Sequence, residues 1–198
     1  MTRAKKLISR GRKRARRAKE SAKVIVSAKL FRIKMNAANS ASFLNLASGL
    51  LSMISSINQR FGLAITFLFL SVFLDFIDGR LARAFKAESL FGLELDSFSD
   101  LISFGVAPAV LVMSFFAVTP AIIVLAILFV GCGAYRLSRY NTLKARDAKK
   151  SGFLGMPITI NGLIFPVLYI LNADSAIFMA ALLAASILMV SKIRISKL

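Results

Sequence analysis

Four aspartates in a strongly hydrophobic chain are the residues best suited to chemistry. Asp75 and Asp78 are three residues apart, and Asp96 and Asp100 are four apart. On helices, each pair therefore shares one face, and two antiparallel neighbouring helices could bring all four carboxylates together. Ionised carboxylates at the edge of hydrocarbon must be hydrated, paired or bound to cations. We therefore expect a cation-binding cluster.

The chemistry open to this cluster is that of hard divalent cations. The chain has no histidine and one cysteine, Cys132, so zinc sites and Ser-His or Cys-His catalysis are largely excluded. Oxygen ligands suit Mg²⁺ or Mn²⁺, and Ca²⁺ could occupy the same site. Two such cations can clamp a pyrophosphate and align an in-line displacement. In the competing interpretation, the acids only solvate helix ends and pair with Arg80, Arg83 and Lys86.

The remainder of the chain is a series of apolar segments separated by short polar joints. Each segment approaches the length of about 20 apolar residues that crosses a bilayer. A soluble helical protein is disfavoured because segments such as 121–130 have no polar face. We therefore predict an all-α, polytopic membrane protein with six transmembrane helices. The predicted spans are 39–57, 61–83, 94–115, 118–139, 156–172 and 174–191.

The basic residues indicate how these spans are oriented. The net charge is +18, and 14 of the 27 Lys and Arg lie in residues 1–34. With the N-terminus in the cytoplasm, 26 basic residues fall on the cytoplasmic side and only Arg60 falls outside. This distribution agrees with the positive-inside rule. We therefore predict a multi-pass protein of the cytoplasmic membrane, with both termini and residues 75–100 on the cytoplasmic side.

Two regions follow from this pattern. Residues 1–37 form a basic cytoplasmic tail and juxtamembrane segment that could be amphipathic, and residues 38–198 form the transmembrane catalytic domain. The tail suits anionic lipid headgroups or serves as an orientation signal. Nucleic-acid binding is disfavoured because no aromatic residue is interleaved with the basic run before Phe31. A cleaved signal peptide is disfavoured because the basic stretch is too long and the apolar segments continue to the C-terminus.

The residues between the aspartates follow a fixed pattern. The run is Asp75-x-x-Asp78-Gly79-x-x-Ala82-Arg83, eight residues, Gly92, three residues, Asp96, three residues and Asp100. It resembles the signature of the CDP-alcohol phosphotransferases, D-x-x-D-G-x-x-A-R-x8-G-x3-D-x3-D, at every fixed position. The resemblance implies a metal-dependent transfer of a phosphatidyl-type group from a CDP-linked lipid to an alcohol, with release of CMP. It also implies a homodimer.

The resemblance implies roles for individual residues. Asp75, Asp78 and Asp96 are the expected core metal ligands. Asp100 is expected to complete the metal site and to act as general base toward the acceptor hydroxyl. The expected contacts with the CDP-lipid come from Asn39, Ser42, Gly79, Ala82, Arg83, Ser89 and Gly92.

The predicted contacts of Asn39 and Ser42 depend on an imperfect match at the opening of the first span. The run Asn39-x-x-Ser42-x-x-Asn45-x-x-x-Gly49 is similar to the family opening P-N-x-x-T-x-x-N-x-x-x-G. Ala38 replaces the proline and Ser42 replaces the threonine. Helix capping is the alternative interpretation of Asn39 and Ser42. Close packing between helices is the alternative interpretation of Gly79 and Ala82.

Three further stretches bear on the acceptor. Residues 91–109, 135–141 and 152–159 resemble the phosphatidylserine synthases, a branch of the family. This implies L-serine as acceptor and CDP-diacylglycerol or CDP-archaeol as donor. Arg136 and Arg139 would bind an anionic group, which serine, glycerol phosphate and inositol phosphate all offer. Snorkelling toward lipid headgroups is their alternative. An ion channel or transporter is the alternative of another class, and it predicts acids near the bilayer midplane.

Overall fold

The computed structural model describes residues 39–85, 90–116, 118–146, 153–191 and 194–195. The predicted basic tail, residues 1–37, lies outside them. The first described helix covers Asn39–Ile57. It is followed by α2 (Phe61–Phe85), α3 (Leu90–Asp100), the π-helix η1 (Leu101–Val106), α4 (Ala107–Phe115), α5 (Pro120–Arg146), the 3₁₀ helix η2 (Ile158–Ile160), α6 (Asn161–Ile170) and α7 (Ser175–Val190). Two short strands, β1 (Phe153–Leu154) and β2 (Arg194–Ile195), pair antiparallel.

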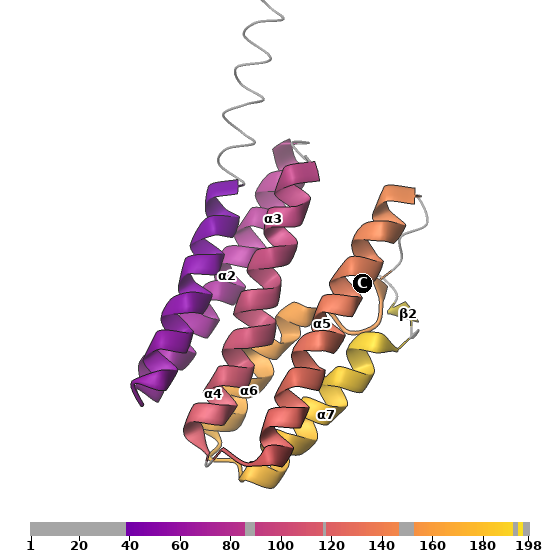
Figure 1. The fold of residues 1–198 in the computed structure, drawn as a ribbon. Helices are drawn as coiled ribbons and strands as arrows, with labels where there is room; N and C mark the ends of the chain where they lie inside the picture. Colours follow the sequence, from indigo (N-terminus) through magenta and orange to yellow (C-terminus); the bar gives the residue numbers. More distant parts are fainter. Residues whose placement is uncertain (1–38, 86–89, 117, 147–152, 192–193, 196–198) are drawn as a thin grey trace, which may run out of the picture.

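The helices form an elongated bundle (Figure 1). The start of the first described helix, the end of α2, the start of α3 and the end of α5 lie at the same end of it. In the described part of the chain, α5 packs along α7 and α2 packs along α6. The prediction of an all-α protein is confirmed, since the described strands have only two residues each.

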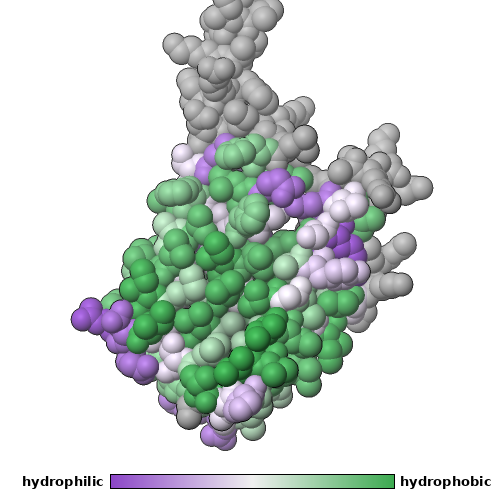
Figure 2. Space-filling model, in the orientation of Figure 1, coloured by the Kyte–Doolittle hydropathy of each residue, from purple (hydrophilic) through white to green (hydrophobic). Residues whose placement is uncertain are grey.

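Four helices are long and apolar enough to cross a membrane: Asn39–Ile57, Phe61–Arg80, Phe91–Phe115 and Pro120–Leu143. Figure 2 shows the corresponding hydrophobic band, with hydrophilic residues gathered toward the ends of the bundle. The protein is therefore a membrane protein. Two shorter apolar helices, Ile158–Ile170 and Ser175–Val190, lie where the fifth and sixth spans are predicted. The count of six spans stays a prediction.

Serine side chains hold the first described helix against its neighbours. Ser48 and Ser52 donate hydrogen bonds to backbone carbonyls of α2, at 2.8 and 2.9 Å. From the other side, Ser103 of η1 donates to the carbonyl of Asn45 at 3.0 Å. A Cβ at Gly49 would lie 2.8 Å from the Cα of Ser103. Small residues thus allow the close backbone approach and interhelical hydrogen bonding that pack helices in lipid.

The third helix changes its winding immediately after Asp100. Residues Leu101–Val106 are π-helical, and the N–H of Ala107 bonds to the carbonyl of Ile102, five residues earlier. Pro108 follows at the start of α4. Proline has no N–H and its ring clashes with the carbonyl four residues earlier, so it disturbs a continuous α-helical ladder. The π-helical turn accommodates this disturbance at a point next to the aspartates.

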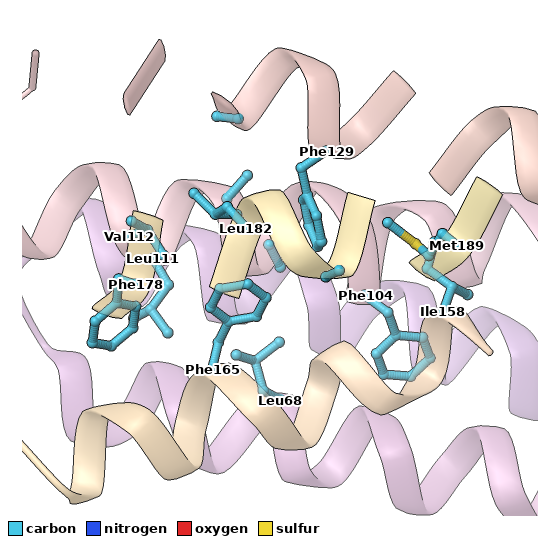
Figure 3. Packing of buried hydrophobic residues seen from close by; sticks show 14 of the residues in the cluster. Leu68, Phe104, Leu111, Val112, Phe129, Ile158, Phe165, Phe178, Leu182 and Met189 are labelled. Atoms are coloured by element: carbon cyan, nitrogen blue, oxygen red, sulfur yellow. The ribbon is translucent and has the colours of Figure 1, made fainter. Parts of the chain in front are cut away.

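The apolar core lies between α2, η1, α4, α5, α6 and α7. Figure 3 shows Phe129, Phe165 and Leu182 facing one another in its centre. Toward the loops that follow α4 and α6, the core becomes aromatic. Phe115 packs against Tyr169 with ring centroids 5.0 Å apart. In Figure 1 this end of the bundle lies opposite the end at which α3 begins.

Candidate active site

The antiparallel arrangement of α2 and α3 brings the aspartates together. Asp75, Asp78 and Asp96 offer carboxylate oxygens that all lie within 4.8 Å of one another. The carboxylate of Asp100 is within hydrogen-bonding reach of Asp75. Two helix faces defined by i,i+3 and i,i+4 spacing therefore meet as the sequence predicts. The roles of these residues as metal ligands and base stay predictions.

Burial makes this arrangement costly without a cation. Asp78 is 4% exposed and Asp100 is 8% exposed. One oxygen of each carboxylate is buried with no hydrogen-bond partner among the described residues. Buried carboxylate oxygens need a compensating partner. An all-oxygen cluster with such orphaned atoms fits a divalent cation of the Mg²⁺ or Mn²⁺ type.

The first described helix contributes directly to the cluster. Ser42 is buried, and its hydroxyl bonds to the carboxylate of Asp78. The carbonyl of Ser42 in turn accepts a hydrogen bond from Ser99 of α3 at 2.8 Å. The backbone N–H of Gly79 also bonds to Asp78. Ser42 thus lies between the two aspartate-bearing helices.

The structure describes only some of the other residues that are predicted to contact the CDP-lipid. Asn39 lies at the start of the first described helix, one turn before Ser42, and Gly92 lies on α3, one turn before Asp96. The side chains of Ala82 and Arg83 and the whole of Ser89 lie outside the described residues. Lipid binding by all these residues stays a prediction.

The two predicted acceptor-binding arginines have different surroundings. Arg136 is 6% exposed and interacts electrostatically with Asp100 and Asp75. Its Nε has no hydrogen-bond partner among the described residues. Arg139 donates to the carbonyls of Val190 and Ser191 at the end of α7, at 3.0 and 3.1 Å. Cations are favourable at helix C-termini, so this residue caps α7 while its neighbour one turn earlier faces the aspartates.

Sequence reasoning gave no role to two other residues near the cluster. Thr159, on η2, lies close to the carboxylate of Asp75. Asn141 of α5 donates to the hydroxyl of Ser97 on α3 at 2.9 Å. The available signal was a polar residue closing an otherwise apolar stretch, Met156-Pro-Ile-Thr159. Its proximity to an aspartate of α2 comes only from the fold.

Residues 35–191 match the family model of the CDP-alcohol phosphatidyltransferases, and the chain belongs to this family. It is therefore a transferase, which sets aside the alternative of an ion channel or transporter. The predicted family resemblance is confirmed. The match covers both aspartate pairs and both arginines.

Individual relatives are similar over about three quarters of the chain. A CDP-diacylglycerol–serine O-phosphatidyltransferase of Bacillus subtilis is 39% identical over 152 residues, which are 76% of this chain and 84% of the relative. One of the same name from Methanocaldococcus jannaschii is 36% identical over 152 residues, with 74% and 69% covered. Archaetidylserine synthase of Methanothermobacter thermautotrophicus is 37% identical over 156 residues, with 77% and 66% covered.

Proposed function

We propose that the protein transfers a phosphatidyl or archaetidyl group from CDP-diacylglycerol or CDP-archaeol to the hydroxyl of L-serine and releases CMP. The observation that carries the proposal is the convergence of four aspartates with the buried cation of Arg136. Similarity to relatives named for transfer to serine supports the acceptor.

The reaction is a displacement at phosphorus. The serine oxygen forms a bond to the lipid-linked phosphorus, and the bond from that phosphorus to the bridging oxygen of the pyrophosphate breaks. CMP leaves with the electron pair of the broken bond. The proton of the serine hydroxyl passes to the carboxylate of Asp100, which is buried beside Arg136 and within reach of Asp75.

Asp75, Asp78, Asp96 and Asp100 would hold two divalent cations, Mg²⁺ or Mn²⁺, with Ca²⁺ able to occupy the same oxygens. When bound, such ions neutralise the pyrophosphate and the leaving phosphate. Ser42 keeps Asp78 oriented through its hydroxyl. The donor nucleotide would lie along the small and polar residues of the signature and of the first described helix.

Arg136 would bind the carboxylate of serine. It is a buried guanidinium facing Asp100, and it retains an Nε donor with no partner among the described residues. A carboxylate bound there would keep the serine hydroxyl near the proposed base. Glycerol phosphate and inositol phosphate carry more charge, and Arg139 is engaged by the end of α7. Among the described residues, Arg136 is the arginine that faces the aspartates, and one guanidinium favours a carboxylate over a phosphate.

The membrane orientation belongs to the same proposal. The helix ends near the aspartates are those followed by clusters of basic residues, while the opposite end carries Arg60. This supports an active site and both termini on the cytoplasmic side of the cell membrane. The basic tail, residues 1–37, would contact anionic headgroups, and the enzyme would act as a homodimer.

An acceptor assay tests the proposal. Purified protein with Mg²⁺ or Mn²⁺ receives CDP-diacylglycerol or CDP-archaeol together with labelled serine, glycerol phosphate or inositol phosphate. We expect a serine-containing lipid and an equal amount of CMP. A lipid product formed only with one of the two phosphorylated alcohols would refute serine as the acceptor. Absence of CMP release with every acceptor would refute the transferase proposal itself.

A further inference from the structure

A hydrogen bond between two side chains joins α3 to α5. The amide nitrogen of Asn141 on α5 donates to the hydroxyl oxygen of Ser97 on α3 at 2.9 Å. The same hydroxyl donates to the carbonyl of Leu93, one turn earlier in α3, at 2.9 Å. Because its one hydrogen is used within its own helix, the hydroxyl presents a lone pair to the amide. Together the two bonds form a bridge, Asn141–Ser97–Leu93, from α5 to the backbone of α3.

In the described part of the chain, α3 and α5 have little other direct packing against each other. α5 packs along η1 and α7, and α3 continues into η1. The two helices are therefore held together near η1, and from there both extend to the end of the bundle at which α3 begins (Figure 1). The bridge lies on this extension. Polar side-chain bonds between helices contribute to helix association in lipid.

The bridge sets the level of α3 relative to α5 close to the proposed site. Ser97 lies three residues before Asp100 on α3, and Asn141 lies five residues after Arg136 on α5. The two helices run in opposite directions, so both intervals lead from the bridge toward η1 (Figure 1). At about 1.5 Å per residue, the intervals measure about 4.5 and 7.5 Å. Asp100 and Arg136 therefore lie within about one helical turn of the same level.

We infer that Asn141 is a positioning residue, which acts through Ser97 to hold Arg136 at a fixed place relative to the aspartates of α3. The three clustered carboxylates belong to α2 and α3, so a metal site can form there without α5. Binding of an acceptor between that metal site and Arg136 depends on both α3 and α5. The bridge should therefore affect acceptor binding rather than metal binding. This consequence for the acceptor rests on the proposed function.

The kinetic test compares Asn141→Ala, Ser97→Ala and the double variant with the wild type. Thr142→Val is the control, since it removes a hydroxyl from the next residue of α5, which is exposed and bonds within its own helix. The kcat and the KM for serine are measured at excess Mn²⁺ on the full-length protein in detergent. Mn²⁺ binding is measured without substrates, from the electron paramagnetic resonance signal of free Mn²⁺.

We expect Asn141→Ala and Ser97→Ala each to raise the KM for serine about three- to fivefold, the typical effect of one hydrogen bond. The double variant should show the same increase as either single variant, because both substitutions remove the same bond. Mn²⁺ binding and kcat should change less than about twofold. Ser97→Thr, which keeps the hydroxyl, and the control should behave as the wild type.

A distance measurement tests the bridge independently of turnover. Spin labels are attached through Phe91→Cys on α3 and Leu143→Cys on α5, both at exposed residues, in a protein that also carries Cys132→Ala. Pulsed electron paramagnetic resonance should give a broader distribution of label distances with Asn141→Ala than without it. Asn141→Leu, which is similar in size to the natural residue, gives the same expected changes if the alanine variant does not fold.

Three outcomes would overturn the inference. A raised KM in Asn141→Ala but not in Ser97→Ala would make the amide a direct acceptor contact, through an Oδ1 that has no hydrogen-bond partner among the described residues. Weaker Mn²⁺ binding in both variants would make the bridge part of the metal site. Either an unchanged KM or an unchanged distribution of label distances would show that the bridge does not position Arg136. Failure of the proposed function is distinguishable, because the wild type would then form no serine-containing lipid, whereas the distance measurement requires no substrate.

Discussion

At one end of the bundle the start of α2 meets α4 and α6 through aromatic rings, and further along, the same helix meets α3 through carboxylates. Phe61 and Phe115 have ring centroids 5.1 Å apart at right-angled packing, which is favourable by itself. The oxygens of Asp75, Asp78 and Asp96, within 4.8 Å, repel one another unless a cation lies between them. The aromatic contacts at the start of α2 therefore stabilise the fold. This stabilisation offsets the repulsion between the carboxylates near the other end of the helix.

The largest expected effect is the loss of turnover in Asp96→Asn. An outer partner of a metal ligand is worth about 10- to 100-fold, so removal of a proposed ligand should reduce CMP release more than about 100-fold. Without metal, the variant should unfold at the same temperature as the wild type or higher, because one repelling charge is gone. Asp174→Asn, at an exposed residue that makes no side-chain cap bond, is the control. Retained activity in Asp96→Asn would remove this residue from the metal site.

The second largest expected effect is a difference between the Arg136 and Arg139 variants in the KM for serine and in thermal stability. Hydrogen bonds to charged groups contribute about 1.5–3 kcal/mol, so Arg136→Gln should lower kcat/KM for serine about 10- to 100-fold, mainly through KM. Arg139→Gln should change the KM for serine less than about twofold and lower the thermal stability, because the carbonyls at the end of α7 lose their donor. Steady-state kinetics on both variants check this. Equal KM increases would place both side chains at the acceptor.

A substitution at the aromatic end of the bundle should change the free energy of unfolding but not the turnover. Phe178 is fully buried and lies 5.1 Å from the ring of Phe116. Lipid tails are as apolar as the ring, so Phe178→Ala loses mainly packing, about 2 kcal/mol in the free energy of unfolding. Turnover per folded molecule should be unchanged. Unfolding in mixed micelles measures the loss, and the exposed Phe73→Ala is the control; a lower kcat in folded Phe178→Ala would show that the two ends are coupled.

The smallest effect is stabilisation by the metal. At a Mn²⁺ concentration ten times its dissociation constant, the wild type should gain about 1.4 kcal/mol by mass action. Phe178→Ala should gain the same amount, and Asp96→Asn should gain much less. Thermal unfolding with and without Mn²⁺ measures these differences. An equal gain in all three proteins would indicate that Mn²⁺ binds elsewhere.

Much of the helical arrangement is predictable from hydropathy, but helix ends are not. The span predicted at 118–139 corresponds to α5, which continues to Arg146, because helical structure extends beyond the apolar stretch. The span predicted from 94 is preceded by another turn beginning at Leu90. In the predicted span 156–172, Pro157 precedes a 3₁₀ turn, and α6 begins only at Asn161.

The aspartates were predictable because local spacing places each pair on one face. The surroundings of the arginines and of Thr159 were not. Spacing put Arg136 and Arg139 on a common face, but whether that face meets α2 or the end of α7 depends on how distant helices pack. Thr159 and Asp75 are far apart in the chain, and no short sequence pattern encodes their proximity in the fold.

The π-helical turn after Asp100 has a consequence for the length of the chain. Each residue advances an α-helix by about 100°, so removing one residue from Leu101–Val106 could restore regular winding while turning everything on one side relative to the other. The aspartates of α3 would then lose their phase with the buried residues of α4, Leu111 and Val112. A substitution in this turn changes a side chain but keeps the number of residues, whereas a deletion changes the rotation of α3 relative to α4. The number of residues between Asp100 and Pro108 therefore sets how the aspartates of α3 are turned relative to the core residues of α4.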